Sequence, residues 1–149
     1  MGGLTASRKR CKNRISEKAG KALRILADTS ILIDLLRGRG HRRDLFKRLT
    51  LEGHTFAVTA INVSEIYAGM RPQEREATRK LLAAFECLPI HCEIAELAGE
   101  LRGAWARKGV TLHLADTLIA ASAMHHRLVL MTDNRKDFPM PELQLWPEA

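Results

Sequence analysis

Hydrophobic residues along the chain fall into short unbroken runs that alternate with stretches of helical spacing. The run "ALRILAD" (22–28) is typical of a buried strand that ends at Asp28, and "TSILIDLLRG" after it has the spacing of a helix that ends at Gly38. Further strands are predicted at "HTFAVTA" (54–60) and "RLVLMTD" (127–133), and less regular ones at "PIHC" (89–92) and "LQLWP" (143–147).

Helical spacing fills most of the chain between these runs. The predicted helices are a basic one within 38–53, a second in 61–70 that opens with Asn62 as N-cap and Glu65 closing a capping box, and three more in 73–88, 93–109 and 114–126. Strands that alternate with helices indicate an α/β fold, with a central, mostly parallel sheet flanked by helices. Function then gathers at the carboxyl ends of the strands.

The composition is that of one globular domain and excludes several function classes. At 149 residues, with 46% hydrophobic and 28% charged residues, the chain is long enough for a single core. Aromatic residues make up only 5%, too few for base-stacking platforms. No apolar run approaches the roughly 20 residues of a membrane span, and the N-terminus lacks the apolar region of a secretory signal. We therefore expect a cytoplasmic protein.

Cysteine and histidine do not predict a structural zinc site. The three cysteines are an odd number without a CxxC pair, and the six histidines show no ligand spacing. The adjacent His125 and His126 are expected to point in different directions and to mark the solvated end of a helix.

The net charge of +7 is concentrated at the N-terminus. Residues 1–24 contain eight Lys or Arg and one acid, Glu17, whereas residues 25–149 are neutral overall. The division predicts a flexible basic arm at 1–24 and a folded domain at 25–149. Such an arm can hold a polyanion; a solvated tail or a wrongly assigned start explains it equally well.

Three acids lie in or beside apolar runs, where a lone carboxylate costs stability. Each has a local explanation: Asp28 caps a helix, Glu65 closes the capping box, and Asp116 lies in a first helical turn. Together they fall at one predicted sheet edge, where converging carboxylates repel unless a cation lies between them. Oxygen ligands without thiolate or imidazole favour Mg²⁺ or Mn²⁺ and phosphodiester hydrolysis.

Competing α/β chemistries are excluded by the residues present. An aspartyl-phosphate phosphatase needs a second Asp two positions after its nucleophile, but Ser30 stands two positions after Asp28. The chain also has no glycine-rich phosphate loop and no GxSxG.

Four blocks of the sequence resemble PIN-domain proteins, and among them the VapC-type toxins of toxin–antitoxin pairs. The blocks are "LADTSILIDLLRG", "VTAINVSEIYAGM", "LADTLIAASAMHHRLVLMTDNRKDF" and "LQLWP", in order between Ile25 and Pro147. The resemblance implies a Mg²⁺-dependent endoribonuclease that cuts tRNA or rRNA, forms a homodimer and is inhibited by a VapB-type antitoxin.

Residue by residue, the resemblance implies that Asp28, Glu65 and Asp116 are the three metal-site acids. For the fourth position Asn134, Asp133 and Asp137 remain open, with Asn134 as a catalytic residue and the two acids as metal ligands. The candidate RNA contacts, which a solvated helix face or an antitoxin site explains as well, are Arg37, Arg39, Arg42, Arg43, Lys47, Arg48, Arg107 and Lys108. The alternative function is a non-catalytic PIN-like module that binds RNA or protein.

Overall fold

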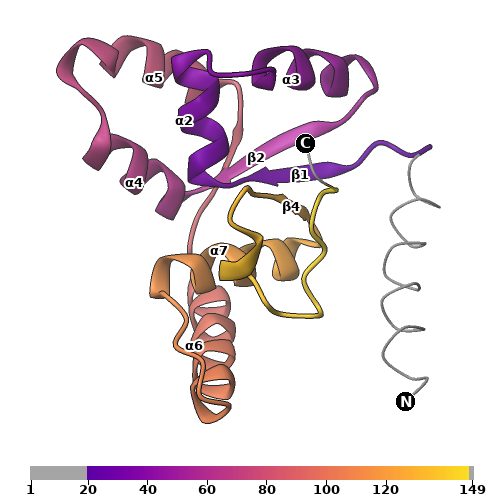
Figure 1. Ribbon diagram of the computed structural model, residues 1–149, viewed down its shortest axis with the longest axis vertical. Coiled ribbons are helices and arrows are strands. Elements are labelled where there is room, and N and C mark those ends of the chain that lie inside the picture. Colours follow the sequence, from indigo (N-terminus) through magenta and orange to yellow (C-terminus); the bar gives the residue numbers. More distant parts are fainter. Residues whose placement is uncertain (1–19, 148–149) are drawn as a thin grey trace.

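Four parallel strands form the central sheet of the protein, in the order β3-β2-β1-β4 (Figure 1). The computed structural model describes residues 20–147. Each neighbouring pair of strands is parallel, so the predicted α/β fold is confirmed and the described sheet is wholly parallel. The strands are β1 (Arg24–Ala27), β2 (Thr55–Thr59), β3 (Glu86–Leu88) and β4 (Val129–Met131).

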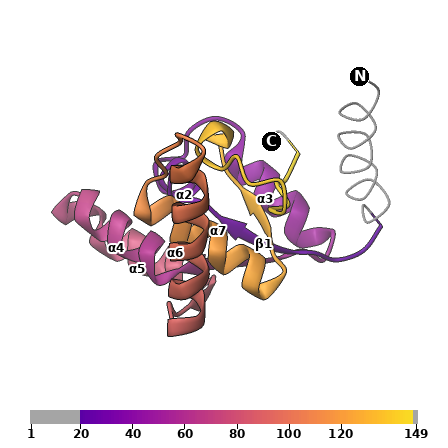
Figure 2. The same cartoon turned by 90° about the horizontal axis from the view of Figure 1, so that it is seen from below.

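Helices cover both faces of this sheet (Figures 1 and 2). On one face lie α2 (Thr29–Arg37), α3 (Arg42–Leu51) and α5 (Arg75–Ala83), and α4 (Ala60–Gly69) contributes Ile66 to the same core. On the other face lies α7 (Leu114–His126), and α6 (Cys92–Arg107) packs against it. In residues 20–147 no helix is long and apolar enough to cross a membrane.

Strands β1 and β4 are apolar on both faces, which explains their unbroken hydrophobic runs. Along β1, Ile25 and Ala27 enter the core beneath α2 and α3, whereas Leu26 enters the core beneath α7. The alanines of α7 allow close packing, and Ala120, Ala121 and Ala123 are fully buried. Helix α7 therefore packs directly against the sheet, and this packing fixes the position of its first turn.

The third strand was predicted in the wrong place. It was expected at 89–92, inside "PIHC", but β3 is Glu86–Leu88 and α5 ends at Ala83 rather than continuing to 88. Residue Ala57 of β2 pairs with Glu86, so pairing to β2 determines where the chain becomes extended. Two of the three β3 residues are exposed at the sheet edge, and the segment therefore lacks an apolar run.

The two ends of the described chain also differ from expectation. The predicted strand in 143–147 is only an isolated bridge, in which Leu145 pairs with Leu130 beside β4. At the N-terminal side, Arg24 was counted both in the basic arm and in the predicted strand of 22–28; it belongs to β1, where it pairs with Thr55. Residues 1–19 of the predicted arm lie outside the described residues.

Candidate active site

Asp28 lies at the carboxyl end of β1, where the chain turns into α2. Its carboxylate accepts a hydrogen bond from the backbone N–H of Thr29 at 2.8 Å and one from the hydroxyl of Thr132 at 2.7 Å. It is the N-cap of α2, as one of its local explanations predicted, and only 5% of the residue is exposed. Burial raises the pKa of Asp28, although both hydrogen bonds lower it.

Glu65 is held by a chain of hydrogen bonds rather than by a helix cap. The N-cap of α4 is Thr59, not Asn62, and the capping box joins Thr59 to Asn62; the predicted capping role of Glu65 is therefore wrong. The buried Asn62 amide donates to the hydroxyl of Thr29 at 3.0 Å, and that hydroxyl donates to Glu65 Oε1 at 2.9 Å. Helix α4 thus presents Glu65 from its second turn beside the start of α2.

Asp116 lies in the first turn of α7, as predicted. Burial is the largest cause that raises its pKa, to about 6, and the charges of Asp28, Asp137 and Glu65 add to the effect. Since like charges raise a carboxyl pKa only when they are near, these four acids from four separate segments lie in one neighbourhood. At the same edge of the sheet, parallel strands and helix N-termini bring them together.

The fourth position separates into two acids with different partners. Asp133 forms an ion pair with Arg42, which also lies 3.7 Å from Asp34. Asp137 raises the pKa of both Asp28 and Asp116, whereas Asp133 raises that of Asp28 but not that of Asp116, so Asp137 lies near more of the carboxylates. Asn134 is exposed, and its backbone N–H donates to the hydroxyl of Thr132 at 3.0 Å. Of the two acids, Asp137 is the one whose charge remains free of an arginine in the described residues.

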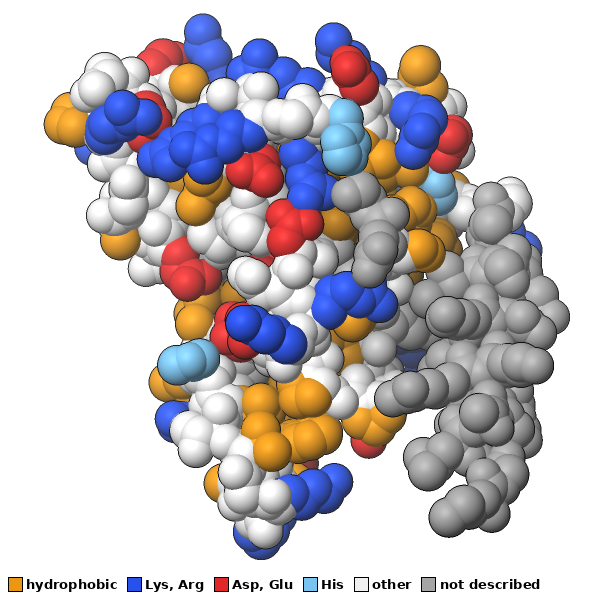
Figure 3. Space-filling model, viewed as in Figure 1, with side chains coloured by type: hydrophobic (Ala, Val, Ile, Leu, Met, Phe, Trp, Pro, Cys, Tyr) orange, Lys and Arg blue, Asp and Glu red, His pale blue; other side chains and the backbone are white. Residues whose placement is uncertain are grey.

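The predicted RNA contacts are not equally available. Arg42 is 7% exposed and paired with two acids, so its assignment to an RNA surface is wrong. The Arg43 side chain donates to the carbonyl of Leu35 at the end of α2, and Arg37 lies 3.5 Å from Glu74. The exposed basic residues of 37–48 are Arg37, Arg39, Arg43, Lys47 and Arg48. Lys and Arg side chains gather over the part of the surface where α2, α3 and α5 lie (Figure 3).

The donor set of the four acids fits a hard divalent cation. Their carboxylates offer oxygen only, and within residues 20–147 no Lys, Arg or His forms an ion pair with any of them. Among the described residues, the only three potential metal-ligand atoms that all lie within 4.8 Å of one another belong to histidines. The carboxylate oxygens are therefore further apart and do not form a closed ligand shell. Mg²⁺ tolerates this arrangement, since it keeps several waters and takes only one or two carboxylates directly.

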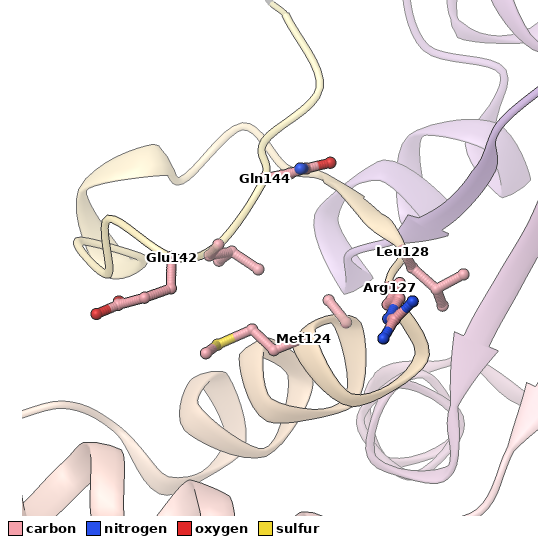
Figure 4. Close-up of a pocket in the computed structure, with 7 residues that line it drawn as sticks. Met124, Arg127, Leu128, Glu142 and Gln144 are labelled. Atoms are coloured by element: carbon pink, nitrogen blue, oxygen red, sulfur yellow. The ribbon is translucent and has the colours of Figure 1, made fainter. Parts of the chain in front are cut away.

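A cavity of about 310 Å³ lies elsewhere in the fold, between the end of α7 and the C-terminal segment (Figure 4). No predicted site residue lines it; the lining residues are Ala123, Met124, Arg127, Leu128, Glu142, Leu143 and Gln144. The acids instead lie at the sheet edge.

Comparison with known proteins agrees with this geometry. Residues 25–139 match the family model described as the PIN domain. The chain belongs to the PIN domain family. This PIN domain is 37% identical over 123 residues to Ribonuclease VapC10 of Mycobacterium tuberculosis, a match that covers 83% of this chain and 91% of that protein. It is 32% identical over 120 residues to Ribonuclease VapC19 of the same organism, with 80% and 96% covered.

Solved structures place the same fold in toxin–antitoxin complexes. A toxin-antitoxin complex from Klebsiella pneumoniae is 34% identical with a TM-score of 0.65, over 80% of this chain and 94% of that one. VapBC2 from Rickettsia felis, bound to a DNA fragment from its promoter, is 23% identical with a TM-score of 0.75, over 83% and 98%. The second likeness concerns the fold alone. The resemblance to VapC-type PIN proteins predicted from the sequence is confirmed.

Proposed function

We propose that this PIN domain is a Mg²⁺-dependent endoribonuclease that acts as the toxin of a toxin–antitoxin pair. The observation that carries the proposal is the convergence of Asp28, Glu65 and Asp137 on Asp116. Burial is the largest cause that raises the pKa of Asp116 to about 6, and the charges of the three other acids raise it further. Repulsion between these carboxylates costs stability, and a bound cation would neutralise part of their charge. The relatives named ribonucleases support RNA as the substrate class.

The residues divide into ligands and the groups that hold them. Asp28, Glu65 and Asp116 would hold the ion, with Asp137 and Asn134 in the fourth position and Mn²⁺ as a possible substitute for Mg²⁺. When bound, Mg²⁺ activates a water and neutralises charge on the phosphate. The Thr132 hydroxyl and the Thr29 backbone N–H fix the two oxygens of Asp28, and the Thr29 hydroxyl fixes Glu65.

The direct test is cleavage of total RNA by the purified protein, with Mg²⁺ or with EDTA. We expect cleavage only with Mg²⁺, and none by Asp116→Asn. Asp44→Asn is the matched control, because Asp44 occupies the first turn of α3 as Asp116 occupies that of α7. Cleavage by Asp116→Asn at the wild-type rate would refute the metal-site assignment. Tight RNA binding without cleavage under all conditions would favour the non-catalytic alternative.

A VapB-type antitoxin is the proposed partner of this site. Converging carboxylates bind a guanidinium well, because it satisfies them bidentately and replaces the cation that they otherwise hold. The homologous folds in toxin–antitoxin complexes support this partner. Expression of the chain alone in bacteria should arrest growth, co-expression with an adjacent small antitoxin gene should restore it, and Asp28→Ala should be harmless.

We further propose that the active form is a homodimer, which light scattering can test.

The proposed RNA surface is the exposed basic edge formed by Arg37, Arg39, Arg43 and Lys47. Its role, and that of the basic arm in 1–24, is phosphate contact without base specificity. Deletion of residues 1–19 should flatten the salt dependence of RNA binding. An unchanged slope would exclude a role of this segment in RNA binding.

A further inference from the structure

Three histidines meet at the end of the molecule where α6 begins and α7 ends. The rings of His91 and His125 are 4.8 Å apart between centroids, those of His125 and His126 4.9 Å, and those of His91 and His126 6.3 Å. His125 is exposed at the end of α7, as expected, but the expectation that the rings of His125 and His126 diverge is wrong, because both lie close to His91. Packing of α6 on α7 brings His91, at the start of α6, to the other two histidines at the end of α7.

The described residues leave part of this histidine cluster without hydrogen bonds. His91 is the N-cap of α6, yet its ring makes no capping hydrogen bond. The Nε2 atom of His126 is buried and has no hydrogen-bond partner among the described residues. A buried imidazole nitrogen without a partner costs stability, unless another group satisfies it.

The spacing of the nitrogens suits a metal ion. One ligand nitrogen from each histidine lies within 4.8 Å of the others. Tetrahedral ligands at about 2.0–2.1 Å from zinc are roughly 3.4 Å apart, so the rings must close by about 1.4 Å at most. His91 and His125 are exposed and can make this adjustment by small rotations.

We propose that His91, His125 and His126 form a binding site for a divalent transition-metal ion of the zinc class. Imidazole nitrogen selects zinc, nickel or copper over magnesium, and three histidines leave one coordination position for water. Burial, together with His125, Arg24 and His91, lowers the pKa of His126, while Glu86 opposes this. The neutral imidazole is the form that binds metal.

A bound ion would link the N-cap of α6 to the last turn of α7. The cluster lies ten residues from Asp116 on α7, about 15 Å along the helix axis. The histidine site is therefore separate from the carboxylate site and uses ligands of different chemistry. Its expected role is to fix α7, the helix that presents Asp116, from its far end.

The test is Zn²⁺ binding by titration calorimetry, with the full chain purified without a polyhistidine tag and with Mg²⁺ in excess. We expect one Zn²⁺ per chain and a rise in the unfolding temperature on binding. His126→Ala should weaken binding by roughly 10- to 100-fold or more, since even the loss of an outer partner of a ligand has that effect. In the Asp28→Asn variant, Zn²⁺ binding and the rise in unfolding temperature should both be unchanged, because the carboxylates are not ligands of the histidine site.

His41→Ala is the matched control for His91→Ala. His41 is also an exposed helix N-cap whose ring makes no capping hydrogen bond. His91→Ala should weaken Zn²⁺ binding and His41→Ala should leave it unchanged. Equal affinity of wild type and His126→Ala would overturn the proposal, and so would a loss of binding in Cys92→Ser with the histidines intact. Because ribonuclease activity is not the readout, failure here would leave the carboxylate assignment untouched.

Discussion

The two ends of α7 carry two clusters of titratable side chains with opposite chemistry. At its first turn, Asp116 joins acids from three other segments, and burial with like charges raises its pKa. At its last turn, His125 and His126 join His91, and burial with nearby positive charge lowers the pKa of His126. In both clusters the fold disfavours the charged form of the group in its centre.

The two clusters differ in the metal ion that suits their ligand atoms. The acid cluster offers hard oxygen and tolerates water between ligand and ion, which suits Mg²⁺. The histidine cluster offers nitrogen on rings already in contact, which suits zinc. With one proposed metal site at each end, α7 is thus expected to respond to two ions independently.

Activity separates the two ends most strongly. Asp28→Asn should reduce RNA cleavage by at least about 100-fold, because the lost charge stabilisation amounts to several kcal/mol. His126→Ala should leave cleavage in saturating Mg²⁺ within about twofold of wild type, since the ligand lies at the far end of α7 and contributes no oxygen. Single-turnover rates on one RNA substrate measure both. Equal losses in the two variants would mean that the ends are not independent.

The free energy of unfolding should distinguish acids that are paired with Arg42 from the acids of the site, which have no arginine partner in the described residues. Arg42→Ala should destabilise the protein by about 2 kcal/mol, because it leaves Asp34 and Asp133 unpaired around a buried site. The value is below that of a fully buried pair because the Asp133 side chain is 44% exposed. Urea unfolding measures it, with Arg48→Ala as the control for loss of an exposed arginine pair.

Asp116→Asn should instead stabilise the protein in EDTA at neutral pH. The folded pKa of Asp116 is raised from 3.8 to about 6, so ionisation destabilises the folded state as pH rises through this range. The gain from the substitution should be complete above pH 6 and vanish towards pH 4. We expect about 1 kcal/mol, after discounting the shift for solvent screening. Unfolding curves at pH 4.5 and 7.5 provide the check.

The histidine end should show the smallest effect, with the opposite sign. The folded pKa of His126 is lowered, so its protonation opposes folding as pH falls below the ordinary value of 6.5. His126→Gln should therefore lose less stability than wild type between pH 7 and pH 5. NMR titration of the His126 ring in EDTA measures the direction of the shift, and a pKa above 6.5 would contradict it.

Local signals explain which parts of the fold were predictable. β1 and β4 are buried on both faces, so their apolar runs were visible, and the acids that follow a strand or begin a helix could be placed at one edge. β3 has three residues, two of them exposed, and its position depends on pairing with β2. Thr59 and Asn62 are both good capping residues, and only the backbone shows which one begins α4.

Long-range contacts explain which parts of the site were missed. Arg42 appeared to belong to a solvated basic run, because its partner Asp133 is distant in sequence. His91 is separated from His125 by the whole of α6, so no ligand spacing indicated their meeting. Thr29 carried no motif, yet its hydroxyl determines where Glu65 lies.

The hydroxyl of Thr29 has a consequence for how the protein folds. It carries a single proton, which goes to Glu65, while its oxygen accepts from Asn62. These hydrogen bonds therefore couple the orientation of helix α4 to the junction of β1 and α2. The acid site is expected to appear late in folding, as one cooperative step that joins the first two strand–helix units. A chain caught before that step would have its sheet without the proposed metal site.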